Sequence, residues 1–164
     1  GRRKEIYDDM LPAGNAVAML DLLRLSRMSG DVELEKRAAG LGSAFAAAVL
    51  QAPAAGAFFL VALDFALGPS YEVVVAGRSR DIATFDMLAN LAKAYIPNAV
   101  VMLRRAEQEP PDIDGFSSFT RYQPIVTGRT VAYACANGAC AKPTPDIASL
   151  LELLGAGSGK GAAE

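Results

Sequence analysis

The sequence contains no histidine, no tryptophan and only two cysteines among its 164 residues. Histidine is the usual general base at neutral pH and the commonest metal ligand, so its absence excludes histidine-based proton transfer by this chain alone. Two thiols without further cysteine or histidine ligands do not make a closed zinc site. We therefore expect no metal site and no bound cofactor.

Long apolar runs and blocks of basic residues are also missing. The longest apolar stretch, 52–63, is shorter than the roughly 20 residues that a membrane span needs. Sixteen basic residues against eighteen acidic ones leave a net charge of −2, without the basic cluster of a nucleic-acid-binding protein. No apolar leader segment is visible in the opening residues. We expect neither a membrane nor a nucleic-acid partner, and a cytoplasmic location.

What the chain does have is a high apolar content, 52%, and a change of pattern at Gly68-Pro69. Before that point, apolar residues recur at helical spacing in three segments. After it, the continuous apolar run 73–76 is typical of a buried strand. The sequence thus predicts an α+α/β fold: a helical segment at 1–68, a small α/β lobe at 69–154 and a flexible tail at 155–164.

The helical segment predicts helices from about residue 13 or 15 to 28, from 31 to about 48, and from Pro53 to Gly68. Two of the three are apolar around most of their circumference, so they must be covered on several sides. This is typical of a partial α/α toroid. We expect cover from outside the chain, and hence self-association of the isolated chain into a homo-oligomer, for four side chains: Val17, Leu20, Leu23 and Phe59.

The second lobe predicts strands at 72–76, 99–103 and 130–135, a turn at 137–138, and helices at 82–95 and 145–154. The spacing of the first two strands fits a parallel crossover. We expect a three-layer-like lobe with a short, mainly parallel sheet. The buried face of its first helix is predicted to hold Ile82, Phe85, Leu88 or Ala89, Ala92 and Tyr95.

Three ordered blocks of sequence resemble one known family. They are Lys4–Asp8 with Leu11–Asn15, then Leu63–Pro69 with Glu72–Gly77, then Ala132–Cys140 followed by Pro143 and Asp146. Together they resemble the family of YyaL-type proteins and spermatogenesis-associated protein 20. The resemblance implies that the chain is the C-terminal part of a longer protein. Its partners would be the missing N-terminal thioredoxin-like domain and the rest of an (α/α)6 toroid similar to those of sugar epimerases and glycosidases.

Three carboxylate or amide residues are candidates for catalysis in the helical segment. Asp8 and Asn15 flank the start of the first helix, where toroid loops line a cavity, but helix capping and loop hydrogen bonds explain them better. Asp64 is the lone charge in an apolar helix, so it should reach an arginine, a backbone donor or solvent.

In the second lobe, two further groups are candidates. Cys135 and Cys140 are read first as structural thiols, because a cytosolic setting favours the reduced form; a disulfide or redox pair and a metal site are the alternatives. The loop of Gly77, Arg78, Ser79 and Arg80 lies between a strand and a helix N-terminus. It is either an anion-binding site or a plain connecting turn.

The sequence favours a structural and binding module of a larger thioredoxin-domain protein, with no catalysis of its own. One alternative is a piece of a carbohydrate-processing toroid that contributes Asp8 and Asn15 to the cavity. A second alternative is a redox module that works through its cysteines.

Overall fold

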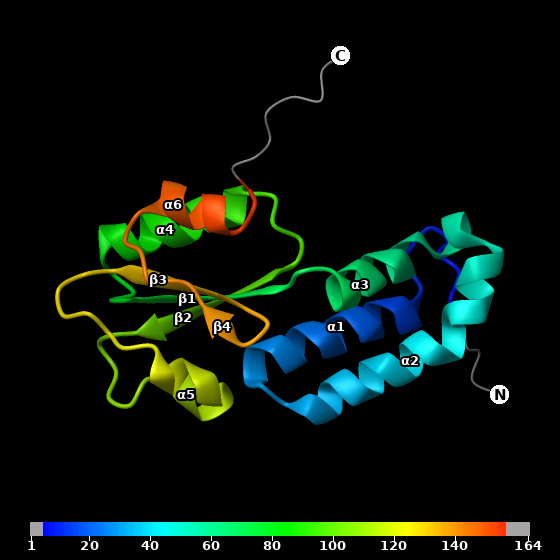
Figure 1. Ribbon diagram of the computed structural model, residues 1–164, viewed down its shortest axis with the longest axis horizontal. Helices are drawn as coiled ribbons and strands as arrows, with labels where there is room; N and C mark the ends of the chain where they lie inside the picture. Colours follow the sequence, from blue (N-terminus) through cyan, green and yellow to red (C-terminus); the bar gives the residue numbers. More distant parts are fainter. Residues whose placement is uncertain (1–4, 157–164) are drawn as a thin grey trace, which may run out of the picture. The chain divides into compact units, whose positions relative to one another are not determined.

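The computed structural model describes residues 5–156, which form two compact units that meet between Pro69 and Ser70. Each unit is described by itself (Figure 1). Most of the tail predicted to be mobile, 157–164, lies outside the described residues, as does Lys4.

The first unit consists of helices α1 (Gly14–Ser29), α2 (Val32–Gln51) and α3 (Ala57–Leu67), with a short 3-10 turn η1 (Pro53–Gly56) before α3. Gly30 ends α1 in the left-handed conformation, at φ 80°, which glycine adopts without a steric penalty. Asp31 then caps α2, because its carboxylate accepts the backbone N–H of Glu33 at 2.8 Å. Both helix boundaries follow from these two residues.

Helix α1 packs against both α2 and α3, and this packing corrects one expectation. Leu20, Leu23 and Phe59 are buried and Val17 is half-buried within this unit, so residues from outside the chain are not needed to cover them. Phe59 also meets Phe45 of α2 edge to face, with ring centroids 6.5 Å apart. The apolar side chains of this unit that stay most exposed lie before α1 or at the ends of α2 and α3: Met10, Leu11, Leu50 and Leu67.

The second unit is built on a four-stranded sheet of order β2-β1-β3-β4. Its strands are β1 (Tyr71–Gly77), β2 (Ala99–Arg105), β3 (Val131–Ala136) and β4 (Ala139–Cys140). Strands β1 and β2 are parallel, as predicted from their spacing. Asn137 and Gly138 both have positive φ, 51° and 77°, which is the geometry of a tight hairpin turn; the predicted turn is confirmed.

The sheet is mixed rather than mainly parallel, because β3 runs antiparallel to β1 and β4 antiparallel to β3. The segment between β2 and β3 contains only α5 (Ile113–Phe116) and the 3-10 turn η2 (Ser118–Tyr122). A parallel β3 would require the connection to return along the whole sheet, which usually takes a long helix. These short helices return the chain to the edge where β2 ended, so β3 starts there and runs back.

Helices cover both faces of the sheet, in agreement with the three-layer-like α/β lobe expected from the sequence (Figure 1). On one face lie α4 (Ile82–Lys93) and α6 (Ile147–Leu153); α5 lies on the other. The α+α/β class is confirmed. The core between the sheet and the helix pair is formed by Val73, Val75, Met87, Leu91, Ala132, Ala134, Leu150 and Leu154.

Helix α4 is rotated relative to the prediction. Its buried residues are Thr84, Met87 and Leu91, whereas Ile82 is 78% exposed and Phe85 68% exposed. Tyr95, placed on the buried face by the sequence, lies beyond the helix and is exposed too. The apolar spacing is compatible with burial of either of two faces of the helix. The face that is buried carries Thr84, whose side chain makes the polar contact described below.

Within residues 5–156, no helix combines the length and apolarity that crossing a membrane would take.

Candidate functional site

The loop that follows β1 lies at the carboxyl edge of the two parallel strands, where α/β folds often bind ligands. Packing requires a glycine at position 77, because no space is left for a side chain. A Cβ at this position would come within 2.5 Å of the Thr84 hydroxyl oxygen and 2.7 Å of the Thr130 hydroxyl oxygen. These two buried hydroxyls share a hydrogen bond of 2.7 Å, which joins α4 to the start of β3. Gly77 therefore makes room for a buried contact between distant segments.

Ser79 already binds an anionic group of the chain itself. Its backbone N–H donates to both carboxylate oxygens of Glu107 at 3.2 Å, and its hydroxyl donates to one of them. The hydrogen bond from the Ser79 hydroxyl lowers the pKa of Glu107 below its usual value. The loop thus has the donors of an anion site, and a carboxylate from the segment after β2 occupies them.

A small cavity of about 110 Å³ lies beside this loop. Arg78 and Arg129 line it together with Asp81, Ala106 and residues 125–128. Arg80 is exposed and does not line this cavity. Binding of an external anion by Gly77, Arg78, Ser79 and Arg80 stays a prediction, and the cavity brings Arg78 together with a residue, Arg129, that the sequence had not singled out.

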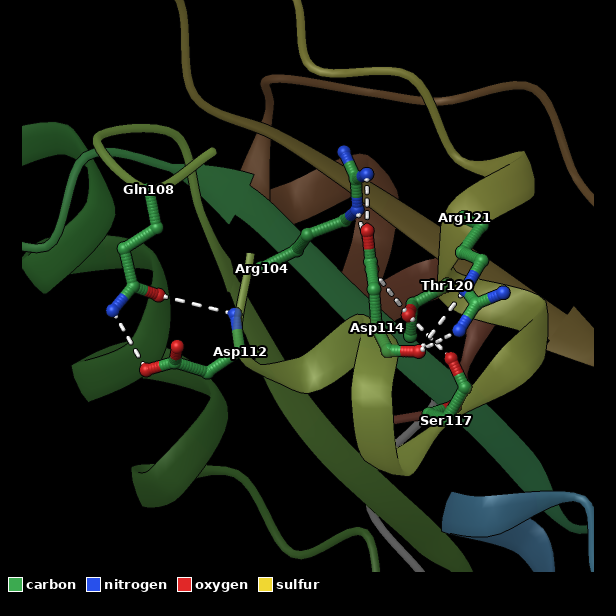
Figure 2. A network of polar contacts seen from close by, with 7 residues as sticks. All are labelled: Arg104, Gln108, Asp112, Asp114, Ser117, Thr120 and Arg121. Carbon is green, nitrogen blue, oxygen red and sulfur yellow. Dashed lines mark hydrogen bonds and ion pairs between the residues drawn. The ribbon is translucent and has the colours of Figure 1, made fainter. Parts of the chain in front are cut away.

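A second polar group, missed by the sequence analysis, fastens the connection between β2 and β3 to the sheet (Figure 2). Arg104, near the end of β2, donates two hydrogen bonds to the Asp114 carboxylate, from Nε at 3.0 Å and Nη2 at 2.7 Å. Their side chains are only 11% and 9% exposed. The Thr120 hydroxyl donates a third bond to Asp114, and Arg121 donates to the Asp114 backbone carbonyl.

The charges in this group shift the pKa of Asp114. The hydrogen bonds from Arg104 lower the pKa of Asp114 below its ordinary value, against the opposing effect of burial. A buried pair of this kind is destabilising when one partner is removed, because the other charge is left without compensation. The network therefore holds the connection against β2. The sequence signal for it was the charged pair Arg104-Arg105, which follows the apolar run 99–103.

The two cysteines face each other across the β3–β4 hairpin and form a disulfide bond. The interpretation of Cys135 and Cys140 as separate thiols is therefore not the one that the structure shows. Cys135 is 5% exposed, whereas Cys140 is exposed on the short strand β4. The side-chain amide nitrogen of the buried Gln123 lies 3.4 Å from the Cys135 sulfur and 4.0 Å from the Cys140 sulfur.

The candidates in the helical unit have structural partners. One Asp8 oxygen accepts the Ala13 N–H at 2.8 Å, and the other accepts the Phe58 N–H at 2.7 Å, so this carboxylate joins the starts of α1 and α3. Asn15 lies inside α1 and donates to the Glu5 carbonyl at 2.6 Å instead of capping the helix. Asp64 is exposed on α3, which fits the expectation that it reaches solvent.

The sequence comparisons give one relative. The chain is similar to spermatogenesis-associated protein 20. It is 27% identical to that protein of Rattus norvegicus over 159 residues, which are 93% of this chain and 19% of the rat protein. The chain thus spans about a fifth of the length of the relative that it matches. No family model matches the sequence. No solved structure matches it either.

Proposed function

We propose that this chain is a structural and binding module at the C-terminal end of a longer thioredoxin-domain protein of the spermatogenesis-associated protein 20 type. The observation that carries the proposal is the similarity itself: nearly the whole chain aligns with a fifth of a much longer protein. A piece of such a protein is expected to present surface to the remainder of its own chain.

The exposed apolar side chains of the helical unit support this proposal. Met10, Leu11, Leu50 and Leu67 are 94%, 78%, 80% and 83% exposed. Met10 and Leu11 precede α1, Leu50 lies near the end of α2 and Leu67 ends α3. Single exposed leucines are ordinary, but four large exposed apolar side chains in one small unit fit surfaces that other helices cover. The proposed occupant is the remainder of the toroid in the same longer protein.

The contacts described above give Asp8 and Asn15 structural roles near helix starts, which weakens the carbohydrate-processing alternative. Two cavities lined by described residues of the second unit lie elsewhere in the sequence. One is the 110 Å³ cavity at Arg78, and the other, of about 610 Å³, is lined by residues from Lys142 to Leu153.

Mixing the chain with the separately produced N-terminal remainder of its longer protein tests the proposal. We expect a one-to-one complex in analytical ultracentrifugation, weakened by Leu50→Lys with Leu67→Lys. The matched control is Ala39→Lys with Ala46→Lys, which adds the same charge at two exposed positions of α2 outside this apolar set. No complex with the remainder, or equal weakening by both pairs of substitutions, would refute the module interpretation.

A further inference from the structure

The position of the disulfide in the hairpin sets up its chemistry. Cys135 and Cys140 are register partners, and the turn at Asn137-Gly138 closes the hairpin on one side of them. On the other side, the Ala141 N–H donates to the Ala134 carbonyl at 2.8 Å. Backbone contacts therefore hold the hairpin on both sides of the sulfurs, so the two residues stay opposite each other when the bond between them is broken.

Access to the two sulfurs is unequal. Cys135 lies in the buried run of β3, whereas Cys140 belongs to the two-residue edge strand β4, whose residues are exposed. Thiol–disulfide exchange begins with a thiolate that approaches one sulfur and expels the other. In this hairpin an incoming thiolate reaches the Cys140 sulfur, and Cys135 is the leaving group.

Gln123 supplies what a buried leaving thiolate needs. Such a thiolate is costly in apolar surroundings unless a donor contacts it. The Gln123 amide nitrogen lies closer to the Cys135 sulfur than to the Cys140 sulfur, at 3.4 against 4.0 Å. Its amide oxygen is buried and has no hydrogen-bond partner among the described residues.

We propose that the Cys135–Cys140 disulfide is a reversible exchange site for a protein dithiol, with Gln123 as the donor to the leaving sulfur. A thiolate of the dithiol attacks the Cys140 sulfur; the S–S bond breaks, and its electron pair goes to Cys135. The second thiol of the partner, once deprotonated, attacks its own neighbouring sulfur and releases Cys140 as a thiolate. The two protons of the dithiol end on Cys135 and Cys140, which gain two electrons as the partner becomes a disulfide.

The geometry favours a dithiol over a monothiol such as glutathione. After the first step, Cys135 remains opposite Cys140 and attacks the mixed disulfide at high effective concentration, which expels a monothiol. With a dithiol, the partner's second thiol attacks the mixed disulfide and completes the reduction, in competition with this reverse attack by Cys135.

The first test uses the full chain under native conditions. Dithiothreitol should reduce the disulfide with the circular dichroism spectrum unchanged, and glutathione at equal thiol concentration should leave most of it oxidised. A thioredoxin-type protein that lacks its second active-site cysteine acts as a monothiol, so Cys135 should make its mixed disulfide short-lived. After rapid acid quenching, peptide mass mapping should place this mixed disulfide on Cys140. Reduction only in denaturant, trapping on Cys135, or equally complete reduction by glutathione would overturn the proposal.

The second test addresses Gln123. Gln123→Met keeps the side-chain length and removes the donor, so reduction by dithiothreitol should slow about tenfold, the effect of one lost hydrogen bond to a charged group. Gln123→Glu should slow it further, because a carboxylate beside the leaving thiolate opposes its charge. Gln51→Met, on the exposed side of α2, is the control and should leave the rate unchanged. A rate that falls from the wild type to Gln123→Met and again to Gln123→Glu supports the proposal, because loss of packing alone would not order the rates by charge. Equal rates for the wild type and both Gln123 variants would remove Gln123 from the mechanism.

Discussion

Substituting Gly77 by alanine tests whether a steric contact fixes this position. The added Cβ would lie 2.5 Å from the Thr84 hydroxyl oxygen, 2.7 Å from the Thr130 hydroxyl oxygen and 3.1 Å from the Thr130 methyl carbon. Both threonines are buried, at 1% and 7% exposure, so neither can turn toward solvent without opening the core. The methyl group must therefore push them apart and break the hydrogen bond between them.

The expected loss follows from two contributions. Overpacking a tight core costs about 2 kcal/mol. Loss of the Thr84–Thr130 hydrogen bond adds about 1 kcal/mol. We therefore expect Gly77→Ala to lower the free energy of unfolding of the second unit by about 3 kcal/mol. Gly115→Ala is the matched control: nothing lies within 4 Å of a Cβ there, and alanine in α5 should be neutral or stabilising by up to about 1 kcal/mol.

Urea unfolding followed by far-UV circular dichroism measures both variants. Combining Gly77→Ala with Thr84→Ala, which removes the nearer hydroxyl, should recover at least about 1 kcal/mol relative to the sum of the single losses. The reasoning fails if Gly77→Ala unfolds at the same urea concentration as Gly115→Ala, or if the two losses at Gly77 and Thr84 are additive.

Three further predictions concern carboxylates with described partners. Asp8→Ala should cost about 2 kcal/mol of stability in urea unfolding, because two helix-start N–H groups lose their acceptor, whereas Asp9→Ala should change little. The pKa of Asp114 is lowered in the folded state, so its contribution is present above its unfolded value and is lost as pH falls below about 4. Asp114→Asn should therefore flatten the decline of the thermal midpoint at acid pH; an unchanged slope contradicts the assignment. Asp146→Ala should cost about 1 kcal/mol and raise the amide exchange rate of Ser149, which loses its cap.

Local patterns predicted most of the helices and strands, because their signals lie within a few residues. Asp31 and Gly30 mark a helix start and a helix end by their own chemistry, and Asn137-Gly138 marks a hairpin in the same way. The direction of β3 could not be predicted from the residues of the strand itself. It depends on whether the segment before it holds a helix long enough to cross the sheet, and this segment holds only short turns.

The rotation of α4 shows why a correct helix can be given the wrong face. Ile82 and Phe85 form an apolar stripe at helical spacing, and Thr84 with Met87 forms another, less apolar one. The second stripe is buried because Thr84 bonds to Thr130, 46 residues away, beside a glycine that leaves space for both. A contact between such distant residues carries no periodic signal.

The position of the candidate site was predictable from the sequence, but the group that occupies it was not. The loop after β1 was expected at the edge where parallel strands end, and it lies there. Its occupant, the Glu107 carboxylate, comes from 28 residues further along the chain. The disulfide was one of several open alternatives, because the spacing of Cys135 and Cys140 became decisive only once the hairpin register placed them opposite each other.

The sheet order also has a consequence for synthesis on the ribosome. Strand β1 is translated first but occupies an interior place, with β2 on one side and β3 on the other. Its Val73–Ala76 run has no neighbour on its second edge until Val131–Ala134 has been translated. The helices before it close through nearby contacts and can fold while translation continues. The nascent chain therefore passes through an interval in which this hydrophobic strand is open to aggregation, and this interval is where chaperone binding would matter most.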